Sequence, residues 1–212
     1  MKKLLLAVIV SLSTVTTAAL AEIKVGIILG FTGPIESLTP AMRDGARMAF
    51  DEASNSGNLL GGESITILEA DSTCVDSAAA TAAAEDLVAQ GVTAIMGADC
   101  SGVTGAINAN VAVPNGILMV SPSATSPGLS KVPDNGTFWR TAPSDAKGGQ
   151  VLAKLALSRG IESIAVTYTN NDYGKGLAEV FEASFARGGG TITASAAHEA
   201  VSYTHLRAHE TG

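Results

Sequence analysis

The chain has 212 residues, of which 46% are hydrophobic and 4% aromatic, and its formal net charge is −7 at pH 7. This composition is typical of a globular protein with a sizeable apolar core. The acidic balance argues against nucleic acid and anionic membrane surfaces as partners, because both carry the same sign of charge as the protein.

Residues 1–21 have the pattern of a secretory signal peptide. Two lysines precede an apolar run at residues 4–10, and Ala19-Leu20-Ala21 forms a small-x-small cleavage site. The apolar run is too short to span a bilayer, and no cysteine near the cleavage site suggests a lipid anchor. We therefore expect a periplasmic protein that begins at Glu22 and does not insert into the membrane after cleavage.

From residue 22 onward, apolar stretches of strand length alternate with stretches of helical periodicity. Strands are predicted at 23–30, 64–69, 94–97, 116–120 and 138–140, and helices at 42–54, 76–90 and 102–112. Strands that alternate with helices of this length indicate an α/β fold with a parallel, doubly wound sheet. We assign residues 22–142 to an N-terminal lobe on this basis.

A second α/β unit is predicted from about Pro143, at residues 143–200. Ser144 is a suitable N-cap for a helix that ends at Ser158, and a strand at 163–167, a helix ending near Arg187 and a strand beginning at Thr191 follow it. Two strands cannot bury both faces of a sheet. We therefore expect these residues to be the start of a second lobe that is truncated.

The final segment, residues 201–212, does not continue either pattern. Its sequence, VSYTHLRAHETG, holds two of the three histidines and has no hydrophobic period. It resembles one reading frame of the adapter left by transposase-based sequencing libraries. We expect it to be an artefactual tail, and the alternative is a genuine polar tail.

The chain has two cysteines, Cys74 and Cys100. In an exported protein, an even pair most often forms a disulfide. A metal site would need more ligands than the nearby sequence offers, and a redox pair would favour a Cys-x-x-Cys spacing. We predict a disulfide that ties the loop after the second strand to the loop after the third, and we expect no metal.

Small polar residues follow two consecutive predicted strands. Cys100 and Ser101 follow the strand at 94–97, and Ser121, Ser123 and Thr125 follow the strand at 116–120. Ligands of open parallel sheets bind outside the carboxyl ends of the strands, and Ser101 also begins a helix, whose N-terminus attracts carboxylate or phosphate. The alternative is that these residues are only N-caps and turn formers.

Five segments together resemble the leucine/isoleucine/valine-binding protein family, in the order and spacing of that family. They are IKVGIILGFTGP, ADSTCVDSAAATAAAEDLVAQGVTAIMGADCSG, NGILMVSPSATSPGL, FWRTAPSD and NNDYGKGLAE. The resemblance implies the two-lobed type I periplasmic-binding fold. It also implies an extracytoplasmic solute-binding protein that delivers an amino acid to the permease subunits of an ABC transporter. We expect such a protein to be a monomer, to use no cofactor and to catalyse no reaction.

The resemblance also implies a set of ligand-binding residues. These are Leu38, Cys100, Ser101, Ser123, Ala124, Thr125 and Tyr173. Ser101 would bind the ligand carboxylate, while the Ser123 carbonyl and the Thr125 hydroxyl would bind the ammonium group. Tyr173 would close over the ligand from the second lobe, although it is equally suited to packing beside a glycine turn.

The sequence departs from the family pattern at two points. Leu38 stands where members often carry an aromatic residue, so the side-chain preference of the pocket stays open. The acidic residue of the second lobe that usually neutralises the ammonium group is expected beyond the end of this sequence.

Two alternative functions remain. A nucleotide-binding enzyme is disfavoured, because residues 26–33 lack the Gly-x-Gly of a dinucleotide site and residues 173–176 lack the upstream glycine and the Ser/Thr of a P-loop. No nucleophile, base and acid assemble from the sequence either. A ligand-sensing receptor or regulator domain has the same fold, so the fold alone does not separate it from a transport protein.

Overall fold

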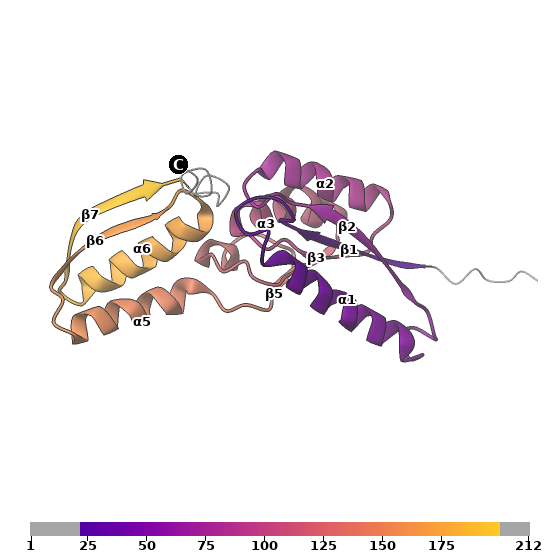
Figure 1. Ribbon diagram of the computed structural model, residues 1–212, viewed down its shortest axis with the longest axis horizontal. Coiled ribbons are helices and arrows are strands. Elements are labelled where there is room, and N and C mark those ends of the chain that lie inside the picture. Colours follow the sequence, from indigo (N-terminus) through magenta and orange to yellow (C-terminus); the bar gives the residue numbers. More distant parts are fainter. Residues whose placement is uncertain (1–21, 200–212) are drawn as a thin grey trace, which may run out of the picture.

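The structure, a computed structural model, describes residues 22–199. The predicted signal peptide and tail lie outside these residues. The described chain forms two parallel β-sheets, one with five strands in the order β2-β1-β3-β4-β5 and one with two strands, β6-β7. Each sheet carries its own helices, and Figure 1 shows the two α/β units side by side, joined by the segment that leads from β5 to α5.

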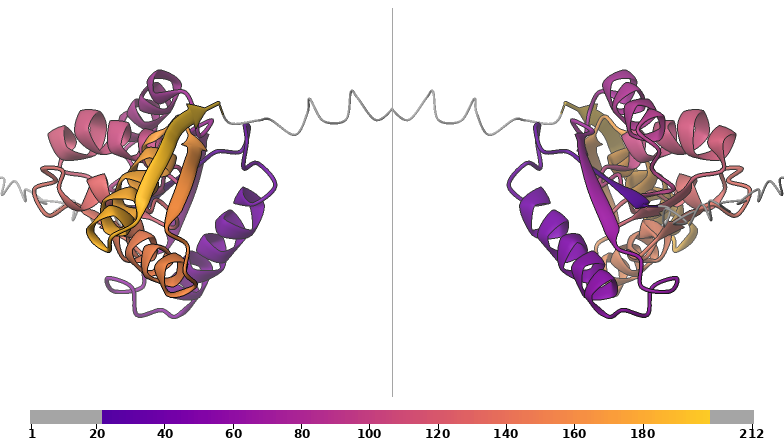
Figure 2. Two further views of the ribbon diagram at one scale, coloured as in Figure 1. Left: turned by 90° about the vertical axis from the view of Figure 1, so that its left-hand side faces the viewer. Right: turned by 90° about the vertical axis from the view of Figure 1, so that its right-hand side faces the viewer.

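The first unit confirms the predicted alternation of strands and helices. Its main elements are β1 (Ile23–Leu29), α1 (Thr39–Asn55), β2 (Ile65–Asp71), α2 (Ser77–Ala89), β3 (Ala94–Gly97), α3 (Ser101–Ile107), β4 (Leu118–Ser121) and β5 (Phe138–Arg140). The five strands are all parallel, and Ala94 of β3 pairs with Val25 of β1 on one side and Leu118 of β4 on the other. Helix α1 lies on one side of this sheet, and α2 and α3 lie on the other (Figure 2).

The main core lies between the sheet and α2 and α3. Ile28, Ile95 and Met119 from the central strands are almost fully buried there. The alanine-rich helix α2 approaches the sheet closely, since a methyl group added at Gly26 would lie 2.8 Å from Leu87 Cδ1. The absence of side chains on β1 at this point therefore allows α2 to pack directly against the sheet.

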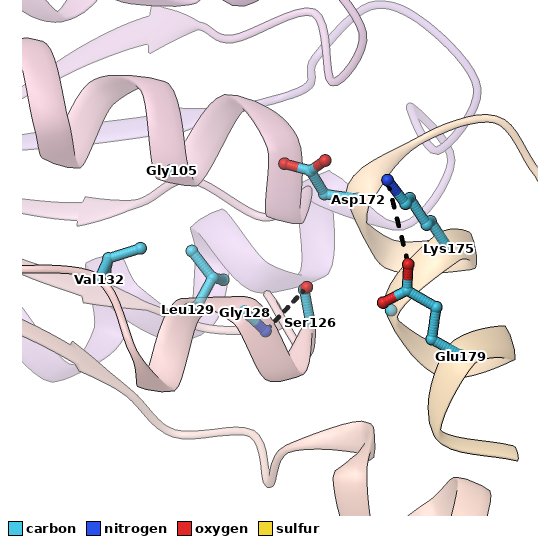
Figure 3. Close-up of a pocket in the computed structure, with 9 residues that line it drawn as sticks. Gly105, Ser126, Gly128, Leu129, Val132, Asp172, Lys175 and Glu179 are labelled. Atoms are coloured by element: carbon cyan, nitrogen blue, oxygen red, sulfur yellow. Dashed lines mark hydrogen bonds and ion pairs between the residues drawn. The ribbon is translucent and has the colours of Figure 1, made fainter. Parts of the chain in front are cut away.

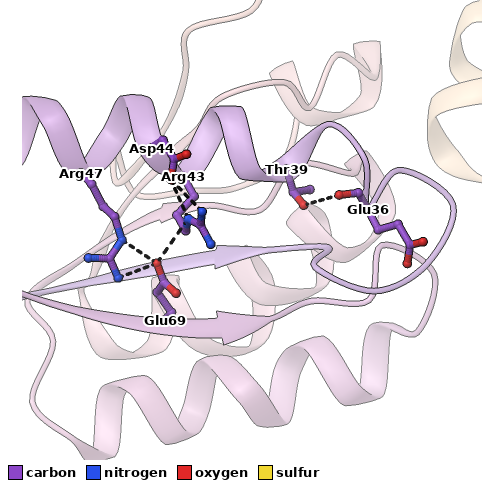
Figure 4. Close-up of polar contacts among 6 residues, drawn as sticks. All are labelled: Glu36, Thr39, Arg43, Asp44, Arg47 and Glu69. Carbon is purple, nitrogen blue, oxygen red and sulfur yellow. Dashed lines mark hydrogen bonds and ion pairs between the residues drawn. The ribbon is translucent and has the colours of Figure 1, made fainter.

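Helix α1 is fastened to the edge strand β2 by ion pairs. The Arg47 guanidinium donates to Glu69 Oε1 from Nε at 2.8 Å and from Nη2 at 2.7 Å, and Arg43 Nε lies 3.9 Å from the same oxygen (Figure 4). Towards β3 and β4, α1 leaves an apolar groove of about 390 Å³ over Leu118, which is 44% exposed. Helix α1 therefore covers only part of this face of the sheet.

The helix predicted at 102–112 extends further and changes its winding. Helix α3 continues into a π-turn at Asn108–Ala112 and a last turn, α4 (Val113–Asn115). Pro114 has no N–H to donate and its ring clashes with the carbonyl four residues earlier, which accounts for the wider turn. Gly116, with φ of 63°, ends the helix, so β4 begins at Leu118 and not at the predicted residue 116.

The second unit contains α5 (Asp145–Ser158), β6 (Ser163–Thr169), α6 (Asp172–Arg187) and β7 (Thr191–His198). The predicted N-cap is confirmed, because Ser144 Oγ accepts a hydrogen bond from the Ala146 N–H at 3.2 Å. A methyl group at Gly149 would lie 2.9 Å from Val180 Cγ1, so the glycine lets α5 pack closely against α6. None of the helices within residues 22–199 has the length and hydropathy that a bilayer span requires.

Candidate ligand-binding site

The strand order of the first sheet defines a crevice at its carboxyl edge. From β1 the chain moves outward to β2 on one side, and then returns to β3 on the other side. This reversal is the topological switch point at which open α/β sheets bind ligands. The loops after β1, β3 and β4 therefore surround the candidate site.

The predicted disulfide is confirmed, and it braces this edge. Cys74 and Cys100 are bonded, with their Cα atoms 5.2 Å apart. The bond joins the loop after β2 to the residue that precedes α3. The predicted site residue Cys100 is thus a fixed point beside the crevice.

Asp99, which sequence reasoning missed, ties the same loops together. The residue is 3% exposed, and Oδ2 accepts from the Gly30 N–H at 2.9 Å. Oδ1 accepts from the Cys100 N–H at 2.9 Å and from Ser72 Oγ at 3.3 Å. An acidic residue two positions after a buried strand and directly before a half-cystine was the signal available in the sequence.

The loops after β3 and β4 are bound to each other. Ser101 Oγ, on a residue only 3% exposed, accepts from the Ser126 N–H at 3.1 Å. Ser123 Oγ donates to the Asp99 carbonyl at 3.0 Å, and the Ala124 N–H donates to Ser121 Oγ at 3.0 Å. These bonds bring together the two loops that carry Ser101, Ser123 and Thr125. The Ser101 oxygen accepts its hydrogen bond from the loop after β4.

Thr125 carries a polar group that the protein leaves unsatisfied. Its Oγ1 is buried and has no hydrogen-bond partner among the described residues. A buried hydroxyl without a partner costs about 1–3 kcal/mol, so such a group in a native fold calls for an explanation. A hydroxyl can both donate and accept, which suits a ligand with a carboxylate and an ammonium group.

Tyr173 and Leu38 lie on the elements that flank the crevice. Tyr173 is 47% exposed in the first turn of α6, and the neighbouring Asp172 Oδ2 would lie 3.8 Å from a methyl group added at Gly102. Leu38 is 56% exposed directly before α1. No hydrogen bond within residues 22–199 links the Tyr173 side chain to the loops after β3 and β4.

A cavity of about 280 Å³ lies next to this site, between α3, the 3-10 turn Pro127–Ser130 and α6. Figure 3 shows Asp172, Lys175 and Glu179 of α6 on one side and Leu129 on the other, with Lys175 Nζ 3.9 Å from Glu179 Oε1. None of the seven predicted site residues lines this cavity, although Ser126 does. The cavity is therefore a neighbour of the predicted site and not the site itself.

Two charged groups at this edge have shifted pKa values. Burial alone would raise the pKa of Asp71, but hydrogen bonds from the Thr32 hydroxyl at 2.6 Å and the Thr73 N–H at 2.8 Å outweigh burial and lower it. Burial lowers the pKa of Arg140, and the nearby Asp145 carboxylate opposes that shift. Within the described part of the chain, no group of three or more His, Cys, Asp or Glu residues is placed to hold a metal ion.

Comparison with known proteins adds the family context. Residues 22–205 match the family described as "Periplasmic binding protein". The chain is 32% identical over 188 residues to the Leu/Ile/Val-binding protein BraC3 of Rhizobium johnstonii, covering 88% of this chain and 50% of that protein. It is 30% identical over 191 residues to the leucine-specific-binding protein of Salmonella typhimurium, covering 90% of this chain and 51% of that protein.

A similar fold is found among solved structures. The isoleucine complex of the branched-chain amino acid transporter substrate-binding protein LivJ from Streptococcus pneumoniae superposes with a TM-score of 0.72 at 27% identity. The match covers 90% of this chain and 54% of that structure. The chain thus spans about half the length of the relatives that it matches.

Proposed function

Because this chain belongs to the periplasmic binding protein family, we propose that it provides one wall of an amino acid site in a solute-binding protein of an ABC transporter. The ligand class is an aliphatic amino acid, with leucine, isoleucine and valine as the first candidates. The protein acts outside the cytoplasm, binds the solute between two lobes that close by a hinge motion, and delivers it to permease subunits. It carries out no reaction on the solute.

The observation that carries this proposal is the match to relatives named for these amino acids. It extends over 82–90% of the chain at 28–32% identity. The family match over residues 22–205 extends over both α/β units and over the positions of the predicted site residues.

The geometry of the site supports the same ligand chemistry. The ligand carboxylate is assigned to the N-terminal turn of the continuous helical stretch that begins at Ser101, where backbone N–H groups point outward. The buried Thr125 hydroxyl, which has no partner among the described residues, is assigned to the ammonium group. The Ser123 carbonyl adds an acceptor for the same ammonium group, and Tyr173 covers the ligand from α6.

A thermal-shift panel on the product of the complete gene, after removal of the signal peptide, tests the function. Leucine, isoleucine and valine should raise Tm, because a ligand that binds only the native state stabilises by about 2.7 kcal/mol at 100 times its Kd. 4-Methylpentanoate, which lacks the ammonium group, and 3-methylbutylamine, which lacks the carboxylate, are the matched controls and should produce much smaller shifts. Equal shifts with the controls, or no shift with any aliphatic amino acid, would contradict the proposal.

A further inference from the structure

Three consecutive carbonyl groups in the loop after β4 are held by residues that flank the connection between the two units. Arg140 Nη1 donates to the Ala124 carbonyl at 3.1 Å and to the Ser126 carbonyl at 2.9 Å. The Asp145 N–H donates to the Thr125 carbonyl at 3.0 Å. Arg140 is the last residue of β5 and Asp145 is the first residue of α5, so residues 141–144 join the two anchors.

The Arg140 guanidinium is suited to this role by its shape and surroundings. It is a rigid planar fork of donors that does not adapt its geometry as a lysine ammonium does. Arg140 also donates a third hydrogen bond, from Nη2 to Ser130 Oγ, at the end of the 3-10 turn that follows the same carbonyl groups. The guanidinium is partly desolvated, and that burial lowers the pKa of Arg140 against the opposing effect of Asp145.

The two carbonyls that Arg140 binds belong to the neighbours of Thr125 on either side. The bond to the Ala124 carbonyl fixes the peptide plane before Thr125, and the bond from the Asp145 N–H to the Thr125 carbonyl fixes the plane after it. The bond to the Ser126 carbonyl holds the next peptide plane, so the direction in which the Thr125 side chain leaves the backbone is set. The Thr125 hydroxyl is itself buried without a partner among the described residues. Its orientation is therefore set through the backbone of the loop and not by a hydrogen bond of its own.

We propose that Arg140 is a positioning residue that orients the Thr125 hydroxyl towards the ligand ammonium group. This inference rests on the proposed function, in which Thr125 binds the ligand. Among residues 22–199, the side-chain hydrogen bonds of Arg140 go to the Ala124 and Ser126 carbonyls and to Ser130, so Arg140 acts through the loop. The Asp145 anchor places the same loop in contact with the second unit, so lobe closure and Thr125 orientation share one hydrogen-bonded segment.

A double-mutant cycle on the product of the complete gene tests the inference. The Kd for leucine is measured by calorimetry for the unchanged protein, Arg140→Gln, Thr125→Val and the double variant. Each single change should raise Kd about tenfold or more, and the double variant should bind no more weakly than the weaker single variant. Arg159→Gln, at an exposed arginine of the second unit, is the matched control and should leave Kd unchanged.

The outcomes separate the inference from the function on which it rests. Suppose that the unchanged protein binds leucine and that the increases in Kd caused by Arg140→Gln and Thr125→Val multiply in the double variant. This result would overturn the positioning role and leave the function intact. An unchanged Kd in Arg140→Gln, or in Thr125→Val, would overturn it equally. Absence of leucine binding by the unchanged protein would overturn both. If Arg140→Gln does not fold, Arg140→Lys replaces it in the cycle, and its effect on Kd must likewise vanish in the Thr125→Val background.

Discussion

At the scale of single residues, two aspartates hold the carboxyl edge of the first sheet in place. Asp99 binds groups from the loops after β1, β2 and β3, and Asp71 binds the backbone and hydroxyl of Thr32 together with the Thr73 N–H. The hydrogen bonds that Asp71 accepts favour its ionised form and lower its pKa. The loops that carry the predicted ligand residues are therefore held by side-chain hydrogen bonds as well as by the disulfide.

Asp71 should make stability depend on pH in the acid range. The pKa of Asp71 in the folded protein is lowered from the usual value of 3.8. Its contribution to the free energy of unfolding is therefore fully present above about pH 3.8 and is lost as the pH falls through the lowered pKa. Urea unfolding between pH 6 and pH 2.5 should therefore show a steeper acid loss for the unchanged protein than for Asp71→Asn. Asp51→Asn, at an exposed carboxylate of α1, is the control and should retain the steep loss. Parallel curves for the unchanged protein and Asp71→Asn would contradict this assignment.

The disulfide should be a large single contribution to stability. Cys74 and Cys100 are 26 residues apart, and closing a loop of that length stabilises by about 3–4 kcal/mol in the chain-entropy model. The variant with alanine at both positions should lose about that free energy of unfolding in urea. Reduction of the unchanged protein should reproduce the loss and should have no effect on the double variant. An unchanged midpoint after complete reduction would be the contrary result.

Residues whose role follows from local sequence context could be predicted, and residues whose role depends on distant partners could not. The cysteine pair was predicted from its even number and the export context. Asp99 bonds to Gly30, which is 69 residues away, and Arg140 acts on carbonyls 14 and 16 residues away. Backbone N–H and carbonyl groups have no sequence signature, so the partners of both side chains were visible only in the fold, although the position of Asp99 before a half-cystine was a hint.

At the scale of elements, periodicity and capping residues predicted the order and type of the strands and helices. The predicted strand 94–97 coincides with β3, and Ser144 caps α5 as predicted. Asp76, predicted as the first residue of a helix, is the N-cap of α2. The boundary between α4 and β4 was placed too early. Gly116 there ends a helix that Pro114 distorts, and an apolar run alone does not show where a helix stops and a strand begins.

Two helical glycines should respond differently to replacement by alanine. A methyl group at Gly45 of α1 meets nothing within 4 Å, so Gly45→Ala should stabilise by about 0.5–1 kcal/mol through helix propensity. A methyl group at Gly176 of α6 would lie 2.9 Å from Pro127 Cδ and 3.0 Å from Ser126 Oγ. That collision with the first unit should cancel or reverse the gain.

Urea unfolding of both variants measures this difference. Because both substitutions add the same methyl group to a helix interior, each serves as the control for the other. An equal gain in stability for Gly45→Ala and Gly176→Ala would show that α6 does not pack against the loop of the first unit.

At the scale of the whole molecule, the two units meet through the first turns of α6 as well as through the Asp145 anchor at the start of α5. Asp172 faces the start of α3 and Gly176 contacts the 3-10 turn after the β4 loop. The sequence predicted two units and their order, but not this contact, because it depends on small residues without a hydrophobic period. The chain spans about half the length of its relatives.

The central claim is that an aliphatic amino acid binds at the loops after β3 and β4, and calorimetric titration of leucine into Ser101→Ala tests it most directly. The protein is the product of the complete gene, and Thr191→Val, at an exposed hydroxyl of β7, is the control. Loss of a hydroxyl bond to a charged carboxylate costs about 1.5–3 kcal/mol. Kd should therefore rise about ten- to hundredfold in Ser101→Ala and stay unchanged in Thr191→Val. Leucine binding with the same Kd in all three proteins would contradict the claim and place the ligand elsewhere.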